Sequence, residues 1–453
     1  MEKFRIKNDP SFVLVQSTEW KCFWSVINNH PTIIYFASTA IKAYISKYFS
    51  VVKIITRVRI MPPVVQVVTG NNEEAYNVQV VDIRSDTVSK PTPAMRQAMA
   101  VAEVGDDVMG EDPTVRELEK RTSAMLRKES AIFVPSGTMA NLIAIMVHCS
   151  QRGSEFITGH KSHIFLYEQG GSASLAGAQC ALVANKADGT FDLDEVRKRI
   201  RVNTDFHQTS TSLILVENTH NMCGGQVLPL SWLDELHTIA SQHDIPIHMD
   251  GARLMNAVIQ SKLPASRIVR DMTSVCFCLS KGLGCPIGSM LCGTEKFITH
   301  AKRIRKLLGG GLRQSGIVAA AGLVAFDEMI DRLQIDHDHT YKIAKGIHCL
   351  KSELVRVDLD KVQTNILMVH IDDNRMLAED FVKRLATVKE NDSIKVIVKV
   401  SIRHEKCIRI VLHWEIDDND VEKAIEKIYM VVKEFESNPL NQKVQKACVS
   451  SIK

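Results

Sequence analysis

The sequence predicts a layered α/β protein in which helices cover both faces of a mostly parallel sheet. From about residue 78 onward, short apolar and β-branched runs alternate with longer segments of helical periodicity. Apolar runs without polar alternation are typical of strands buried on both faces, and their alternation with helices is typical of parallel sheets. Beyond about residue 345 the pattern changes and predicts a smaller α+β domain.

The large domain is expected over residues 79–344. Its clearest helix is 112–126, because Asp112 suits the N-cap, Pro113 suits the first turn and apolar residues follow at helical spacing. Apolar runs predict four buried strands over residues 131–134, 212–216, 245–249 and 274–279. The small domain, over residues 345–453, is expected to contain strands at 365–370 and 407–412 and an amphipathic helix at 421–435.

The composition is that of a globular protein. The chain has 453 residues, of which 45% are hydrophobic and 24% charged, and this excludes a disordered, collagen-like or coiled-coil chain. The formal net charge is +4, but residues 1–60 alone carry nine basic and three acidic side chains. Because the remaining residues are slightly acidic, we expect no nucleic-acid partner.

The first 78 residues are expected to form a basic amino-terminal extension. Residues 22–41 carry no formal charge, but they include Asn28, Asn29, His30 and Pro31, whereas a membrane-crossing helix needs about 20 consecutive apolar residues. We therefore expect no membrane span. A basic, acid-poor composition that contains serine is compatible with a mitochondrial targeting segment, and a disordered extension on a cytoplasmic protein is the alternative.

The eleven cysteines show no Cys-x-x-Cys spacing. This spacing is typical of zinc and redox sites, so we expect reduced thiols and no metal ion.

Polar residues follow several of the predicted strands, where an open α/β sheet binds its ligand. Gly137 and Thr138 lie where a strand gives way to a helix, and backbone N–H groups there can hold a phosphate, although a plain turn would look the same. Asp250 ends the third predicted strand and could bind a cation or serve as an N-cap.

Two further residues could complete a cofactor site. Lys281 follows the fourth predicted strand and could be a partly desolvated nucleophile or an exposed lysine in a glycine-rich turn. His163 could stack on a flat ring or fill a core position. Taken in order, these features suit pyridoxal phosphate (PLP), which needs a lysine for its aldehyde, an anion for its pyridine nitrogen and backbone donors for its phosphate.

The sequence also resembles the low-specificity L-threonine aldolases, PLP enzymes of the aspartate-aminotransferase fold type I. The resemblance extends from about residue 80 to the region of Arg409, and its motifs follow one another in the family's order. The motifs are VDIRSDTV (81–88), VGDDVMGEDPT (104–114), PSGT (135–138), ENTHN (217–221), HMDGAR (248–253), LSKGLG (279–284) and GGGLRQSG (309–316).

The resemblance implies a seven-stranded, mostly parallel sheet and a set of cofactor-binding residues. Lys281 is implied to form the Schiff base with PLP, and Asp250 to pair with its pyridine nitrogen. His163 is implied to stack on the ring. The remaining cofactor-binding residues are implied to be Gly137, Thr138, Arg253 and Arg313, the last of these acting across a subunit interface.

The resemblance further implies the substrate-binding residues and the reaction. Ser85, Arg253 and Arg409 are implied to bind the substrate carboxylate, and His207 to lie near the substrate hydroxyl as a second histidine besides His163. The implied activity is cleavage of L-threonine or L-allo-threonine to glycine and acetaldehyde by a homodimer or homotetramer. The alternatives are another fold-type-I lyase acting on β-hydroxy or β-substituted amino acids, and a PLP-fold protein without activity.

Overall fold

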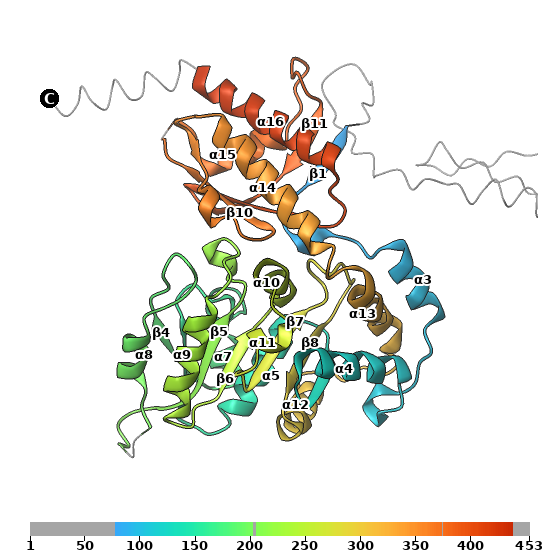
Figure 1. The fold of residues 1–453 in the computed structure, drawn as a ribbon, viewed down its shortest axis with the longest axis vertical. Helices are drawn as coiled ribbons and strands as arrows, with labels where there is room; N and C mark the ends of the chain where they lie inside the picture. The colour runs from blue at the N-terminus through green and yellow to red at the C-terminus, as the bar shows by residue number, and fades with distance from the viewer. Residues whose placement is uncertain (1–77, 203–204, 374, 438–453) are drawn as a thin grey trace, which may run out of the picture. The chain divides into compact units, whose positions relative to one another are not determined.

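The computed structural model describes residues 78–202, 205–373 and 375–437 (Figure 1). The expected extension of residues 1–78 lies outside the described residues except for Val78, so the expectations for it stay predictions. Among the helices that the structure describes, none combines the length and the apolar character needed to cross a membrane.

A seven-stranded sheet forms the centre of the large domain, with strand order β2-β8-β7-β6-β5-β3-β4. Within this sheet, β8 alone runs antiparallel to its neighbours. The strands are β2 (Ser130–Val134), β3 (Ser154–Gly159), β4 (Gln179–Val183), β5 (Ser210–Glu217), β6 (Ile247–Asp250), β7 (Ser274–Cys278) and β8 (Ser289–Gly293). The predicted fold class and the four predicted strands are confirmed, while β3, β4 and β8 are additions to them.

Helices cover both faces of this sheet because its strands are apolar on both sides. Phe133 of β2 packs into a hydrophobic cluster with α4, α9, α10 and α13, whereas its neighbours Ile132 and Val134 pack with α5 and α12 on the opposite face. The helices are α3 (Pro93–Val101), α4 (Pro113–Leu126), α5 (Gly137–His148), α6 (His163–Leu166), α7 (Gly171–Ser174), α8 (Leu193–Arg199), α9 (Leu230–Ser241), α10 (Leu254–Ser261), α11 (Ala265–Ile268), α12 (Glu295–Leu307) and α13 (Gly316–Glu328).

The start of α4 follows the sequence prediction. The Asp112 side chain caps the helix by accepting a hydrogen bond from the Val115 N–H at 3.0 Å, and Pro113 occupies the first turn. Asp112 also accepts a hydrogen bond from the Gly316 N–H at 2.9 Å. One buried carboxylate therefore fixes the starts of both α4 and α13.

The smaller domain combines a four-stranded antiparallel sheet, of order β12-β13-β10-β9, with the parallel pair β1-β11. The expected boundary after residue 344 falls inside α14, and β1, from the start of the expected large domain, pairs with β11. The elements are β1 (Gln79–Asp82), α14 (Leu333–Cys349), β9 (Val355–Arg356), β10 (Ile366–Ile371), α15 (Ala378–Leu385), β11 (Val396–Lys399), β12 (Ser401–His404), β13 (Cys407–Val411) and α16 (Asp418–Ser437).

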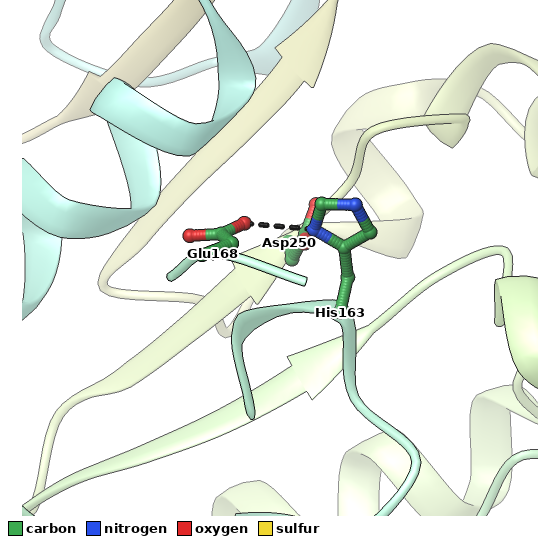
Figure 2. Close-up of side chains that lie close together, drawn as sticks. All are labelled: His163, Glu168 and Asp250. Atoms are coloured by element: carbon green, nitrogen blue, oxygen red, sulfur yellow. Dashed lines mark hydrogen bonds and ion pairs between the residues drawn. The ribbon is translucent and has the colours of Figure 1, made fainter. Parts of the chain in front are cut away.

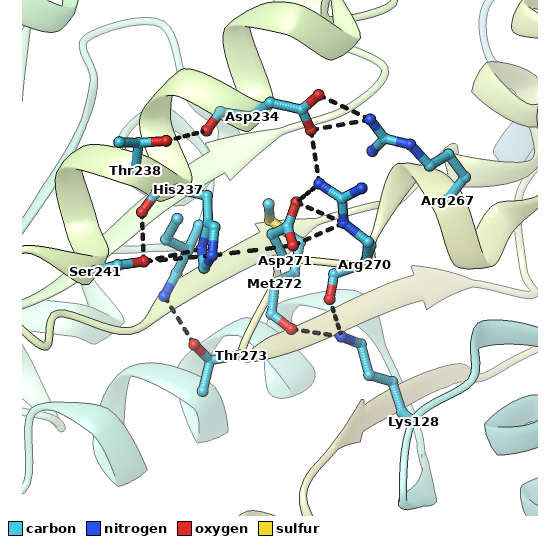
Figure 3. Close-up of polar contacts among 11 residues, drawn as sticks. Lys128, Asp234, His237, Thr238, Ser241, Arg267, Arg270, Asp271, Met272 and Thr273 are labelled. Atoms are coloured by element: carbon cyan, nitrogen blue, oxygen red, sulfur yellow. Dashed lines mark hydrogen bonds and ion pairs between the residues drawn. The ribbon is translucent and has the colours of Figure 1, made fainter.

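A polar network ties together the edge of the large sheet where β6 and β7 begin (Figure 3). Asp234 of α9 accepts hydrogen bonds from Arg267 and Arg270 at 2.8 and 3.2 Å. The Lys128 ammonium donates to the carbonyl oxygens of Arg270 and Met272 at 3.2 and 2.6 Å. Such partly exposed pairs are each worth at most about 1 kcal/mol, so we interpret this edge as structural.

Candidate active site

The opposite edge of the large sheet gathers the residues that the sequence singled out. Strands β2, β3, β5, β6 and β7 run in the same direction, so their carboxyl ends meet at this edge. A cavity of about 190 Å³ opens there. It is lined by Ser85, Thr87, His163, Tyr167, Asn221, Arg253, Lys281, Arg403 and Arg409. We call this cavity the catalytic pocket.

Asp250, the last residue of β6, is a buried carboxylate without a cationic partner. Its side chain accepts hydrogen bonds from the Asn141 amide at 3.0 Å and from the Ala252 N–H at 3.0 Å. No ion pair between described residues includes Asp250, which is only 3% exposed. It is not the N-cap of α10, because Arg253 occupies that position. A buried carboxylate without a cation suits a cationic ligand group.

His163, at the start of α6, lies beside this carboxylate. Its Nδ1 is 2.9 Å from Glu168 Oε1, and Figure 2 shows these two side chains facing each other next to Asp250. Although burial lowers the pKa of the His163 imidazole, the hydrogen bond to Glu168 and the charge of Asp250 raise it above the ordinary value of 6.5.

Ligating atoms of His163, Glu168 and Asp250 lie within 4.8 Å of one another, a spacing that could hold a metal ion. However, the Asn141 amide donates a hydrogen bond to each carboxylate, at 2.9 Å to Glu168 and 3.0 Å to Asp250. Together with the hydrogen bond between His163 and Glu168, these bonds connect all three side chains. We therefore interpret the three side chains as a hydrogen-bonded cluster.

Hydrogen bonding at the amide oxygen of Asn141 fixes the orientation of this side chain. Because its Nδ2 donates to two carboxylates, its Oδ1 must accept, and it lies 3.2 Å from Nε2 of His248. Burial lowers the pKa of His248 to about 4, so this histidine is neutral and carries one N–H, at Nε2. Its Nδ1 then accepts the hydroxyl hydrogen of Ser274 at 2.8 Å. The chain of bonds leaves Asn141 only one amide orientation.

Lys281 lies in the connection between β7 and β8, three residues after β7 ends. Its side chain lines the catalytic pocket and is half-buried. Within the described part of the chain its ammonium group has no hydrogen-bond or ion-pair partner. The lysine predicted as a nucleophile is therefore present in the pocket and unengaged.

The first turn of α5 offers free backbone donors. The Ser136 side chain caps this twelve-residue helix by accepting from the Met139 N–H at 3.2 Å, while the N–H groups of Gly137 and Thr138 have no partner among the described residues. A Cβ atom on Gly137 would lie 2.8 Å from the Cys278 sulfur. A glycine is therefore required where β7 passes the helix start.

Arg409, in the middle of β13, is a buried cation that lacks an anion. It is 6% exposed; its Nη1 donates to the Asn221 side chain, and its Nε has no partner among the described residues. Burial and the nearby charges of Arg253 and Arg403 lower the pKa of Arg409 to about 9. A carboxylate placed here would supply the missing partner.

Arg253, in contrast, already holds a carboxylate. Its Nε and Nη2 donate to the two oxygens of Asp86, each at 2.7 Å, and both side chains are almost completely buried. Although burial opposes ionisation, the attraction of Arg253 lowers the pKa of Asp86 to about 2. Ser85, next to this pair, lines the pocket, and its contact with the substrate carboxylate stays a prediction.

Two predicted residues are not part of the pocket of their own chain. His207 is 72% exposed in its side chain and precedes β5, at the end of that strand opposite to Glu217 and the site. Arg313 is 53% exposed and pairs with Asp106 at 2.8 Å. Of the other eight predicted residues, five line the pocket, namely Ser85, His163, Arg253, Lys281 and Arg409. Asp250 lies beside His163, and Gly137 and Thr138 begin the helix that follows β2.

Several polar residues that support the site have no role in the sequence predictions. Glu217 accepts from the His163 N–H at 2.7 Å and from the Asn221 N–H at 2.8 Å, which holds both segments in place. Asp86, Asn141 and Glu168 are others, as described above. The sequence does contain a feature that could have identified Asn141, because it is one polar residue within the apolar helical run that follows the predicted phosphate turn.

The residues of the site fit PLP. A buried carboxylate without a cation suits a protonated pyridine nitrogen, and the unpartnered N–H groups at the start of α5 suit a phosphate. His163 lies beside Asp250, where a ring bound to that carboxylate would be within reach. Lys281 supplies an unengaged amine in the same pocket.

Comparison with known proteins agrees with this arrangement. Residues 82–374 match the beta-eliminating lyase family. The chain is 45% identical to the probable low-specificity L-threonine aldolase 2 of Arabidopsis thaliana over 357 residues, which cover 78% of this chain and 98% of the relative. It is 39% identical to the low specificity L-threonine aldolase of Escherichia coli K12, over 74% of this chain and 98% of the relative.

Solved structures show the same fold at lower identity. A putative L-allo-threonine aldolase from Listeria monocytogenes superposes with a TM-score of 0.64 at 20% identity, covering 80% of this chain and 97% of that one. The serine palmitoyltransferase of Sphingomonas wittichii superposes with a TM-score of 0.62 at 16% identity, covering 87% and 99%. These likenesses concern the fold.

Proposed function

The chain belongs to the beta-eliminating lyase family, together with relatives named low-specificity L-threonine aldolases, and from this premise we propose that it cleaves L-threonine and L-allo-threonine to glycine and acetaldehyde. The enzyme is a lyase, and PLP is its cofactor. The observation that supports the proposal most directly is the meeting of Lys281 with an unpaired buried Arg409 in one pocket beside the buried carboxylate Asp250.

The geometry supports a set of residues that would hold PLP. Lys281 would hold the aldehyde carbon through its amine, and Asp250 would hold the pyridine nitrogen. The N–H groups of Gly137 and Thr138 would bind the phosphate. When bound, PLP withdraws the electron pair that the breaking Cα–Cβ bond releases.

The substrate carboxylate is bound by Arg409, which lines the pocket and has an unpartnered Nε, and the neighbouring Ser85 hydroxyl adds a hydrogen bond. Arg253 also lines the pocket, and its pair with Asp86 fixes its position. Held in this way, the substrate keeps its Cα–Cβ bond in one orientation. Such orientation of the reacting groups accounts for a large part of the rate enhancement by an active site.

His163 acts as the base that accepts the proton of the β-hydroxyl. The hydrogen bond from its Nδ1 to Glu168 orients the ring and leaves Nε2 for the substrate or for a water molecule. We assign the base to His163 because, of the two histidines that the sequence indicated, it is the one in the pocket.

Exposed apolar residues support a homo-oligomer, either a dimer or a tetramer. Val101, Val104 and Met109 are exposed before α4, and Leu307 and Ile317 are exposed on either side of Arg313. The two segments meet, because the Asp107 N–H donates to the Arg313 carbonyl at 2.9 Å. A second copy covering this surface would place Arg313 at a subunit interface, where it could bind the phosphate of the neighbouring site.

We further propose that the enzyme acts in the cytoplasm and forms glycine there from threonine. The alternative is a mitochondrial location, with which the basic composition of residues 1–60 is compatible. Residues 1–78 fused to a fluorescent reporter are expected to give a diffuse cytosolic signal, and a mitochondrial signal would refute this location.

The activity is tested with purified protein supplied with PLP and L-threonine. We expect equimolar glycine and acetaldehyde, and an absorbance band of the bound cofactor that borohydride removes. Lys281→Ala should lose both the band and the activity. Release of pyruvate and ammonia from serine in place of acetaldehyde from threonine would identify another lyase, and the absence of every product would indicate an inactive protein.

A further inference from the structure

A second and larger cavity, of about 470 Å³, adjoins the catalytic pocket. Arg403 lines both cavities, and Asn221 of the pocket is followed directly by Met222 of the second cavity. We call this second cavity the distal cavity. Its other lining residues include Lys161, Arg356, Lys361, Met368, His370 and Cys407.

The strand register shows that the two cavities lie along one sheet face. Met368 of β10 pairs with Arg409 of β13, and His370 pairs with Cys407. Because alternate residues of a strand point to the same side, these four side chains share one face of the four-stranded sheet. Arg409 lines the catalytic pocket, while the other three line the distal cavity. The distal cavity therefore continues the pocket along this face.

The distal cavity carries positive charge that the described residues do not neutralise. Arg356 is paired with Asp372 at 2.8 Å, and Lys361 with Asp358 at 2.6 Å. Lys161 and Arg403, by contrast, take part in no ion pair within the described ranges.

Arg403 also has an unsatisfied hydrogen-bond donor. Its Nε is buried and has no partner among the residues the structure describes. The charge of Arg403 acts on Arg409, whose pKa it helps to lower. An anion between the two guanidinium groups would reduce this repulsion.

We propose that the distal cavity binds an anionic group carried on the β-carbon of the substrate, so that 2-amino-3-hydroxy dicarboxylic acids are substrates of this enzyme. The inference rests on the aldolase activity proposed above. The methyl group of threonine leaves both cations unpaired, whereas a carboxylate in its place pairs with them.

The chemistry of 3-hydroxyaspartate shows that no further reactant is needed. The Cα–Cβ bond breaks, the β-hydroxyl loses its proton and its oxygen becomes the carbonyl oxygen of glyoxylate. The electron pair of the broken bond remains on Cα, which takes up a proton and becomes the methylene group of glycine. The products are the same as for threonine, with glyoxylate in place of acetaldehyde.

The two cations are expected to recognise acids of different length. Arg403 borders the catalytic pocket, so it can reach a carboxylate attached directly to the β-carbon. Lys161 lines only the distal cavity, so it should meet a carboxylate one methylene further out, as in 3-hydroxyglutamate.

The test measures kcat/KM for glycine release with the PLP-loaded enzyme. The substrates are L-threonine, 3-hydroxyaspartate, 3-hydroxyglutamate and the neutral 3-hydroxynorvaline. We expect Arg403→Met to lower the ratio of kcat/KM for 3-hydroxyaspartate to that for threonine at least about tenfold, as for loss of a charge-assisted contact. Arg403→Lys, which keeps the charge, should restore most of this ratio. Lys161→Met should lower the ratio for 3-hydroxyglutamate alone.

Arg356→Met is the matched control, because it removes a cation from the same cavity that Asp372 already neutralises. An equal fall of the ratio in Arg356→Met and Arg403→Met would overturn the inference, as would faster cleavage of 3-hydroxynorvaline than of 3-hydroxyaspartate by the unaltered enzyme. Failure to cleave threonine at all would instead refute the proposed function and the inference with it.

Discussion

The buried pair of Asp86 and Arg253 makes the sharpest prediction for stability. Asp86 is fully buried, and its pKa of about 2 against an ordinary 3.8 corresponds to about 2–3 kcal/mol of stabilisation at neutral pH. Asp86→Asn keeps the shape but leaves the Arg253 charge buried without its partner. Such a loss costs about 3–5 kcal/mol, a large part of the roughly 5–15 kcal/mol that stabilises a typical protein.

The assay is urea unfolding followed by circular dichroism at neutral pH. Asp327→Asn is the matched control, since Asp327 also accepts two hydrogen bonds from one arginine, Arg121, but has a side chain that is 60% exposed. An exposed pair of this kind is worth about 0–1 kcal/mol. If the two variants lose the same free energy of unfolding, the argument from burial is wrong.

The pH dependence of this difference follows from the direction of the pKa change. The pKa of Asp86 is lower in the folded protein, so its contribution is complete above the unfolded pKa and is lost as the pH falls toward the folded one. The gap in unfolding free energy between the unaltered protein and Asp86→Asn should therefore narrow from about pH 5 to about pH 3. A gap that stays constant over this range would contradict the lowered pKa.

Three further predictions concern the site. Glu168→Gln replaces the carboxylate that raises the pKa of His163 with a neutral amide, so the limb of log kcat/KM that rises with pH should move to lower pH; an unmoved limb would count against His163 as the base. Gly137→Ala places a Cβ 2.8 Å from the Cys278 sulfur and should weaken PLP binding about tenfold or more in equilibrium dialysis, and undiminished binding would count against the start of α5 as the phosphate site. Arg409→Met should raise the KM for L-threonine about 10- to 100-fold with a smaller effect on kcat, and an unchanged KM would exclude Arg409 as the carboxylate ligand.

The sequence was sufficient for elements with a strong local signal. The strand at residues 131–134 is a continuous apolar run, and α4 begins with Asp112 and Pro113, so both were predicted close to their true bounds. In contrast, β8 has the sequence Ser-Met-Leu-Cys-Gly, which has little intrinsic strand preference. Its pairing between β2 and β7 makes it a strand, and such tertiary contacts are invisible in a short window of sequence.

The same distinction applies to the site. Asp250 and Lys281 were found because each follows an apolar strand, where an α/β sheet places its ligands. Asp86 gains its importance from Arg253, 167 positions away, and Asn141 from carboxylates on two other segments, so neither role can be inferred from neighbouring residues. His207 was placed near the substrate by resemblance alone, and the single chain does not bring it there.

The pairing of β1 with β11 bears on how the protein is made. Residues 79–82 leave the ribosome early, but their partners at residues 396–399 follow after about 320 further residues, which takes roughly 15–60 s at ordinary rates of synthesis. Ser85 and Asp86 come directly after β1, so the pocket they line or support cannot be complete until nearly the whole chain has emerged. Arg253 is made a little past the middle of this interval and must wait through the rest of it for its carboxylate, so a nascent chain stalled before residue 396 should contain a folded central sheet without a competent substrate site.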